Sequence, residues 1–292
     1  MDISLALGSG GPRGSAHIGV LRILEREGFR VRAISGSSIG SLVATLYAAG
    51  HTPEELEQFF VALEPAWLSA WPLLEGAGFL SRRGIESWLR DHLGDLTFEQ
   101  LKLPCAVVAV DLNSRRGVTF REGPIVSAVL GSTAVPGLYP PEEYSPYSLI
   151  DGGALDPVPV RAARLLAPKL PVVAVSLQTP TEQPFVSLTA QLPVSAAVAE
   201  RITGLALTQT FQVFVQALDI GQRELSELRL KLDAPDVIIH PDVGHINLWD
   251  RVEVPEVAAL GEQATLEALP TLRGAVSFPA RFRRAIRWGG AP

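Results

Sequence analysis

Short apolar runs rich in β-branched residues recur along the chain and limit its fold more than any other feature of the sequence. Continuous apolar runs of this length are typical of strands buried on both faces of a sheet. Helical patterns lie between the runs, and such alternation is typical of a mostly parallel sheet covered by helices. The sequence therefore predicts an α/β fold, a three-layer α/β/α sandwich, with strands over 3–7, 31–35, 106–111, 148–150, 172–177 and 237–240.

Three helices are indicated by the residues at their starts. Thr52-Pro53-Glu54-Glu55 combines a capping box with proline at the first helical position, and apolar residues follow at i, i+3, i+4 and i+7. Asp156 before Pro157 predicts a second helix that continues through Leu166. A third helical pattern covers about residues 255–268.

Length and charge limit the domain organisation and the class of partner. The 292 residues fit one large domain, which we place over residues 1–272, followed by a basic and aromatic tail over 273–292. The net charge of −6 argues against nucleic-acid binding, which needs a basic surface. The oligomeric state stays open.

The expected location is the cytoplasm. The N-terminus has neither the basic segment nor the apolar run of a signal peptide, and no stretch of 18 apolar residues predicts a spanning helix. Cys105 is the only cysteine, so an intrachain disulfide is impossible. Because neither an H-E-x-x-H helix nor an EF-hand loop occurs, we expect no metal, and we expect no cofactor.

The pentapeptide Gly36-Ser37-Ser38-Ile39-Gly40 matches the G-x-S-x-G pattern of a nucleophile elbow. It follows a predicted strand and precedes a helical pattern that ends at Gly50, which is the context that such an elbow requires. Gly36 and Gly40 would permit the sharp turn, and Ser38 would be the nucleophile. The alternative is an ordinary strand–helix turn made of small residues.

A second glycine-rich loop, residues 8–14, links the first predicted strand to a helix. It lacks the Walker lysine and the third glycine of a dinucleotide fingerprint, which disfavours nucleotides. Backbone amides at a helix N-terminus can instead stabilise a developing oxyanion. Since proline has no amide hydrogen, the candidate donors are Gly10, Gly11 and Arg13, with Ile39 as a further one.

A serine nucleophile also needs a base that accepts its proton. None of the five histidines has a local setting typical of a catalytic triad. Asp151-Gly152-Gly153 is more informative, because an acid at the end of a predicted strand is followed by two glycines that let another backbone approach. The alternative is an acid in an ordinary turn.

Together, Gly10-Gly11-Pro12-Arg13-Gly14, the Ser38 pentapeptide and Asp151-Gly152-Gly153 closely resemble the motifs of the patatin-like phospholipases, in the same order. The resemblance implies a serine acyl hydrolase with a Ser-Asp dyad. In it Ser38 is the nucleophile, Asp151 the general base and the Gly10–Gly11 loop the oxyanion hole, and the motif glycines are Gly14, Gly36, Gly40, Gly152 and Gly153. The family loop usually reads G-G-G-x-R-G, and here Ser9 stands at its first glycine.

Other functional interpretations stay open. His240 or His245 could complete a triad of the α/β-hydrolase type, in which a histidine comes late in the chain. The chain could also bind acyl lipids without catalysis, or transfer the acyl group to an alcohol. The resemblance implies lipid or fatty-acyl esters as substrates of a phospholipase A or lysophospholipase type.

Two segments could cover the site, and the tail could contact a membrane. Residues 64–80 carry Trp67, Trp71 and Phe79, and residues 185–218 are mostly apolar. In the tail, arginines alternate with large apolar residues, so it could lie on an anionic surface at the inner face of the membrane, and the alternative is a solvated tail.

Overall fold

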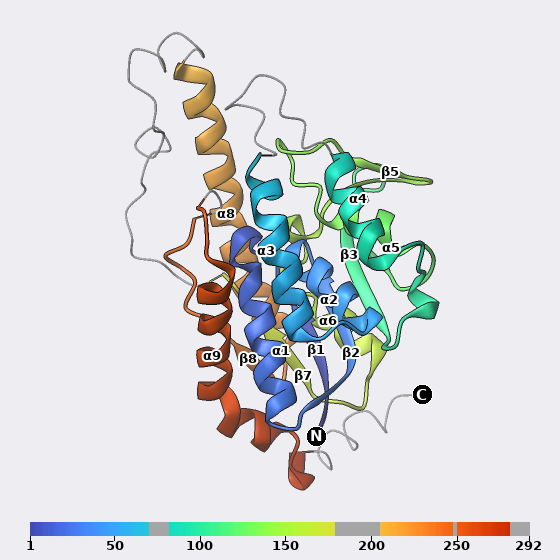
Figure 1. Ribbon diagram of the computed structural model, residues 1–292, viewed down its shortest axis with the longest axis vertical. Helices are drawn as coiled ribbons and strands as arrows, with labels where there is room; N and C mark the ends of the chain where they lie inside the picture. Colours follow the sequence, from blue (N-terminus) through green and yellow to red (C-terminus); the bar gives the residue numbers. More distant parts are fainter. Residues whose placement is uncertain (70–81, 179–204, 248–249, 281–292) are drawn as a thin grey trace.

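The computed structural model describes residues 1–69, 82–178, 205–247 and 250–280 (Figure 1). Within these ranges the strands form one sheet in the order β5-β6-β3-β2-β1-β7-β8, and β4 also pairs with β3. The strands are β1 (Asp2–Leu7), β2 (Arg30–Ser37), β3 (Cys105–Asp111), β4 (Arg116–Phe120), β5 (Glu142–Tyr144), β6 (Tyr147–Asp151), β7 (Val172–Val175) and β8 (Val237–Ile239).

The sheet has a parallel part and an antiparallel part. The parallel part consists of four strand pairs, β8 with β7, β7 with β1, β1 with β2 and β2 with β3. β4 and β6 pair antiparallel with β3, and β5 pairs antiparallel with β6. The predicted strands are all present, whereas β4 and β5 were not expected. Each of these two strands contains exposed positions, which break up the apolar runs used to recognise buried strands.

Helices cover both faces of the sheet (Figure 1). α1, α3 and α9 lie side by side on one face, where α2 also packs on β2, and α6 packs on the other face and contacts α8. The helices are α1 (Ala16–Arg26), α2 (Ile39–Ala49), α3 (Pro53–Ser69), α4 (Arg82–Leu93), α5 (Ile125–Ser132), α6 (Val160–Leu166), α8 (Leu205–Asp233) and α9 (Val254–Ala275), and the short 3₁₀ helices are η1 (Gly11–Ser15), η2 (Phe98–Gln100) and η3 (Gly152–Ala154).

The side chains of the parallel strands alternate between two cores. Leu5 of β1 and Val173 of β7 belong to the large cluster that includes residues of α1, α2 and α9. Ala6 and Val172 point the other way and join residues of α6 and α8. The strands are therefore buried on both faces, which confirms the three-layer α/β/α sandwich.

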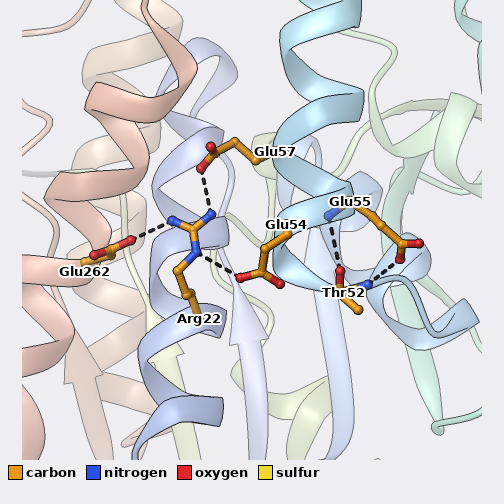
Figure 2. Close-up of polar contacts among 6 residues, drawn as sticks. All are labelled: Arg22, Thr52, Glu54, Glu55, Glu57 and Glu262. Carbon is orange, nitrogen blue, oxygen red and sulfur yellow. Dashed lines mark hydrogen bonds and ion pairs between the residues drawn. The ribbon is translucent and has the colours of Figure 1, made fainter.

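A single guanidinium joins three helices on the α1 side of the sheet (Figure 2). Arg22 of α1 donates to Glu262 of α9 at 2.6 Å, and to Glu57 and Glu54 of α3 at 2.7 and 3.3 Å. Three carboxylates around one partly buried arginine form a network, which stabilises more than an isolated surface pair. The network holds α3 in place, and α3 carries residues of the cavity described below.

The predicted helix starts have different outcomes. The capping box is confirmed, because Thr52 N donates to Glu55 at 2.8 Å and Glu55 N donates to the Thr52 hydroxyl at 3.2 Å (Figure 2). The start at Asp156 is wrong, since α6 begins only at Val160. The Asp156 carboxylate pairs instead with Arg229 of α8 at 3.3 Å.

Much of the predicted lid and tail lies outside the described residues. Residues 70–81 and 281–292 are not described, and this includes Trp71, Phe79 and the arginines near the C-terminus. Arg273, at the start of the predicted tail, continues α9 and pairs with Glu27 at 2.8 Å. Among the helices of the described ranges, none combines the length and apolar character that a membrane crossing needs.

α1 and α9 are in close contact because each has a glycine at the crossing. A Cβ on Gly19 would collide with the carbonyl oxygen of Ala258, and a Cβ on Gly261 with that of Ala16. The two backbones therefore touch directly. Gly274, also in α9, has no atom near its Cβ position.

We predict opposite effects of alanine at two of these glycines. Gly19→Ala must separate the helices and should destabilise the fold by about 1–3 kcal/mol. Gly274→Ala gains helix propensity without a clash and should stabilise by up to about 1 kcal/mol. Urea denaturation of both variants measures the two changes, and equal effects would contradict the close contact.

Candidate active site

The register of the sheet brings Ser38 and Asp151 together. In β2, Ser37 pairs with Val108 of β3, and in β6, Asp151 pairs with Ala109, the next residue of β3. β4 occupies the opposite edge of β3 at these positions, so β2 and β6 share one edge. β2 runs parallel to β3 and β6 antiparallel, and their C-terminal ends therefore meet.

Ser38 lies at a strained turn between β2 and α2. Its φ is +53° and its ψ is −125°, a conformation that side chains larger than hydrogen rarely adopt. Gly36 and Gly40 have no room for a Cβ, since one on Gly36 would meet the Gly40 carbonyl and one on Gly40 the Leu7 carbonyl. The Ser38 amide donates to Ser132 Oγ at 2.9 Å, which supports the turn. This is the geometry of a nucleophile elbow.

Asp151 is a buried carboxylate with defined partners. Ser38 Oγ donates to its Oδ2 at 2.6 Å, and the Gly153 amide donates to its Oδ1 at 2.7 Å. Burial raises the pKa of Asp151 to about 6, although both hydrogen bonds lower it. A carboxyl group with a pKa near neutrality can accept a proton at neutral pH and return it.

The glycine-rich loop presents two free amides to the site. The amides of Gly10 and Gly11 donate to no other group in the described structure, and both residues line the same cavity as Ser38. The Ser9 amide donates to the Pro157 carbonyl at 2.8 Å. The Arg13 amide donates to the Gly10 carbonyl at 3.2 Å, so it is not free as the amides of Gly10 and Gly11 are, and its role as an oxyanion donor stays a prediction.

Ser38 and Asp151 open into a cavity of about 360 Å³. The loop residues 9–12 form one part of its wall, and α3 and α8 form other parts. Most of the lining is apolar, which suits an acyl chain: Phe60, Leu63, Val135, Pro136, Leu138, Leu225, Val252 and Val254.

The sequence pattern described as patatin-like phospholipase matches residues 5–164, more than half of the chain. This chain belongs to the patatin-like phospholipase family. An uncharacterised NTE family protein of Mycobacterium tuberculosis is 39% identical over 160 residues, which cover 54% of this chain and 44% of that protein. The protein named lysophospholipase NTE1 of Mycosarcoma maydis is 31% identical over 170 residues, which cover 55% of this chain and 9% of that protein.

Among solved structures, VipD from Legionella pneumophila shares the fold, with a TM-score of 0.51 and 14% identity. The superposition covers 92% of this chain and 67% of VipD. This likeness extends beyond residues 5–164, to which the family pattern is matched. The matched segment spans less than half the length of the curated relatives named above.

The side chain of the family motif arginine, Arg13, has a structural role that the sequence did not indicate. Arg13 is 1% exposed, and its guanidinium donates to the Ile246 carbonyl at 2.7 Å, to Gln178 at 3.3 Å and to Asp219 of α8 at 3.5 Å. Arg13 thus ties the glycine-rich loop to α8 and to the segment after β8. The side chain holds the loop while its own amide is used within η1.

The other motif glycines allow close packing around the dyad. A Cβ on Gly14 would collide with Ile39, and one on Gly152 with the Val108 carbonyl. A Cβ on Gly153 would meet three polar atoms. These contacts explain why the patatin motifs place glycine at these positions.

No histidine lines the described part of the cavity. His17 is fully buried, and its Nε2 lies 2.8 Å from the Gly8 carbonyl, to which it can only donate. Burial lowers the pKa of His17 to about 4, so the ring is neutral and supports the loop. His240 and His245 are exposed residues outside this lining. The described residues also contain no group of three side chains suited to a metal ion.

The segment predicted to cover the site is partly seen. Residues 185–204 lie outside the described residues, but the end of the segment belongs to α8, and Ala217 and Leu218 line the cavity. α8 also contributes Gln222, which no sequence motif indicated. Nothing in the sequence near Gln222 indicates that the fold brings it close to Asp151.

We predict that Asp151→Asn stabilises the folded protein at pH 8. Because the pKa is raised on folding, the ionised carboxylate opposes folding once the pH is above about 6. Removing that charge should raise the free energy of unfolding by about 1–3 kcal/mol. The gain should disappear toward pH 4, where the carboxyl is protonated in the folded state.

Thermal or urea unfolding at pH 8 and pH 4 measures this difference. Asp242→Asn is a matched control, because Asp242 is exposed and its replacement should change stability by less than about 0.5 kcal/mol at either pH. A loss of stability in Asp151→Asn at pH 8 would contradict the cost of the buried charge.

Proposed function

We propose that this chain is a lipid acyl hydrolase that cleaves carboxylic esters through an acyl-Ser38 intermediate, with Asp151 as the general base. The 2.6 Å hydrogen bond from Ser38 Oγ to Asp151 Oδ2, inside a mostly apolar cavity, is the observation that carries the proposal. The raised pKa of Asp151 supports a role in proton transfer at neutral pH.

In the first half of the reaction, Asp151 accepts the hydroxyl proton as Ser38 Oγ attacks the ester carbonyl carbon. The carbonyl oxygen gains negative charge, and the free amides of Gly10 and Gly11 are the groups proposed to stabilise it. Collapse of this intermediate breaks the bond to the alcohol, which leaves with the proton held by Asp151. The product is an ester of Ser38.

The substrate class follows from the cavity and the family. Apolar side chains of α3, α8 and the segment 135–138 can surround an acyl chain, which favours esters of fatty acids over small polar esters. The family name and the fungal relative's name, lysophospholipase, support phospholipids or lysophospholipids. Such substrates reside in membranes, so we include peripheral contact at the cytoplasmic membrane face in the proposal.

A fluorophosphonate probe tests for the activated serine. We expect one equivalent of label on the wild-type protein by intact mass, none on Ser38→Ala, and labelling at least about 100-fold slower in Asp151→Asn, because the base is lost. Single replacements of His51, His92, His240 and His245 should leave labelling within about threefold of wild type, and no histidine replacement should abolish labelling as Ser38→Ala does. A folded wild-type protein that binds fatty acid but is not labelled would favour lipid binding without catalysis.

The pH dependence tests the base. Since Asp151 must be ionised, kcat/KM for a fatty-acyl ester should fall about tenfold for each pH unit below a midpoint near 6. Burial also raises the pKa of Asp156 to about 6, so Asp156→Asn is the control and should keep the midpoint. If the midpoint disappears in Asp156→Asn, the titration belongs to Asp156, and the pH profile does not support Asp151 as the base.

A further inference from the structure

Ser9 carries a buried hydroxyl that the mechanism above does not use. The residue is 2% exposed, it lines the cavity, and its Oγ has no hydrogen-bond partner among the described residues. The family loop has glycine at this position, so the hydroxyl is a feature of this chain. A buried hydroxyl without a partner destabilises a fold, and alanine at the same position would avoid that cost.

The Ser9 hydroxyl is close to the dyad. A Cβ built on Gly153 would lie 3.0 Å from Ser9 Oγ, 2.9 Å from Gln222 Nε2 and 2.9 Å from Asp151 Oδ1. Two polar groups from the glycine-rich loop and α8 therefore converge with the catalytic carboxylate on one face of Gly153. All three residues line the cavity.

Deacylation, the second half of the proposed reaction, needs a site that holds a water molecule beside Asp151. Once Ser38 is acylated, its Oγ no longer donates to Asp151, and the carboxylate must take a proton from a water molecule instead. A water molecule needs two to four polar partners to be held in a defined position. Gln222 Nε2 can donate to one lone pair of its oxygen, while Ser9 Oγ and Asp151 each accept one of its protons, which leaves the second lone pair free to attack the acyl carbon.

We propose that Ser9 and Gln222 bind the hydrolytic water beside Asp151 and so accelerate deacylation. This assignment rests on the proposed acyl-Ser38 intermediate and deepens it. The water oxygen forms a bond to the acyl carbon as Asp151 accepts a water proton. The bond from that carbon to Ser38 Oγ then breaks, Oγ takes the proton from Asp151, and the fatty acid is released.

The proposed water position beside Asp151 is also the position from which the alcohol departs in the first half of the reaction. The alcohol oxygen leaves from the side of the acyl carbon from which water later attacks, because Asp151 exchanges a proton with both. Ser9 and Gln222 are thus also placed to contact the departing oxygen. Deacylation is the sharper test, because there the small water molecule has no other part by which the cavity can position it.

The test measures acylation and deacylation separately in Ser9→Ala, Ser9→Gly and Gln222→Met. Each enzyme is mixed with p-nitrophenyl butyrate, quenched at intervals and examined by intact mass for the acyl group on Ser38. We expect the deacylation rate to fall about tenfold in each variant, with acyl-enzyme accumulating and the rate of fluorophosphonate labelling within about twofold of wild type.

Ser226→Ala is the matched control. Ser226 lies on α8, its hydroxyl is also buried without a partner, and it does not line the cavity. Its replacement should leave deacylation unchanged. Ser9→Gly restores the usual family loop, so a folded variant is expected even if alanine strains the turn, and circular dichroism confirms the folded state.

Two results would overturn the assignment while leaving the proposed function intact. One is turnover and deacylation equal to wild type in the Ser9 and Gln222 variants. The other is turnover that falls together with fluorophosphonate labelling, without accumulation of acyl-enzyme, because that places the defect in acylation. A wild-type protein that is not labelled at all contradicts the proposed function itself, which is a different outcome.

Discussion

The junction of β2 and β6 on one edge of β3 is the constraint on which the site depends. Val108 and Ala109 are adjacent residues, and their partners are Ser37 and Asp151. A shift of one residue in either register would turn the side chains to opposite faces and separate the Ser38 hydroxyl from the Asp151 carboxylate. The buried strands on both sides, packed into two cores, fix that register.

Around the junction, glycines pack so closely against neighbouring backbone that a side chain would not fit. Gly36, Gly40 and Gly152 each approach a carbonyl oxygen at the place where a Cβ would be. Two buried side chains then hold the glycine-rich loop, His17 through the Gly8 carbonyl and Arg13 through α8. The loop amides are thereby oriented before any substrate binds, which is how preorganised groups stabilise a developing charge.

Local chemistry made much of the fold and site predictable from sequence. The capping box at Thr52, the elbow around Ser38 and the left-handed Gly50 after α2 depend only on neighbouring residues, and the structure has each of them. Long-range contacts were not predictable. Asp156 pairs with Arg229 of α8, so the helix start predicted at Asp156 was wrong. Gln222 reaches the site only because α8 packs there.

Burial of the Asp151 carboxylate links stability to the proposed chemistry. The desolvation that raises its pKa makes the ionised form unfavourable in the folded protein, and the same desolvation makes it a stronger base toward Ser38. A better-hydrated aspartate would stabilise the fold and weaken the base. The Ser9 hydroxyl, which has no partner among the described residues, is a second polar group that is buried at a cost in stability. The Asp151 carboxylate and the Ser9 hydroxyl both lower the stability of the fold, and such costs are expected at reactive sites.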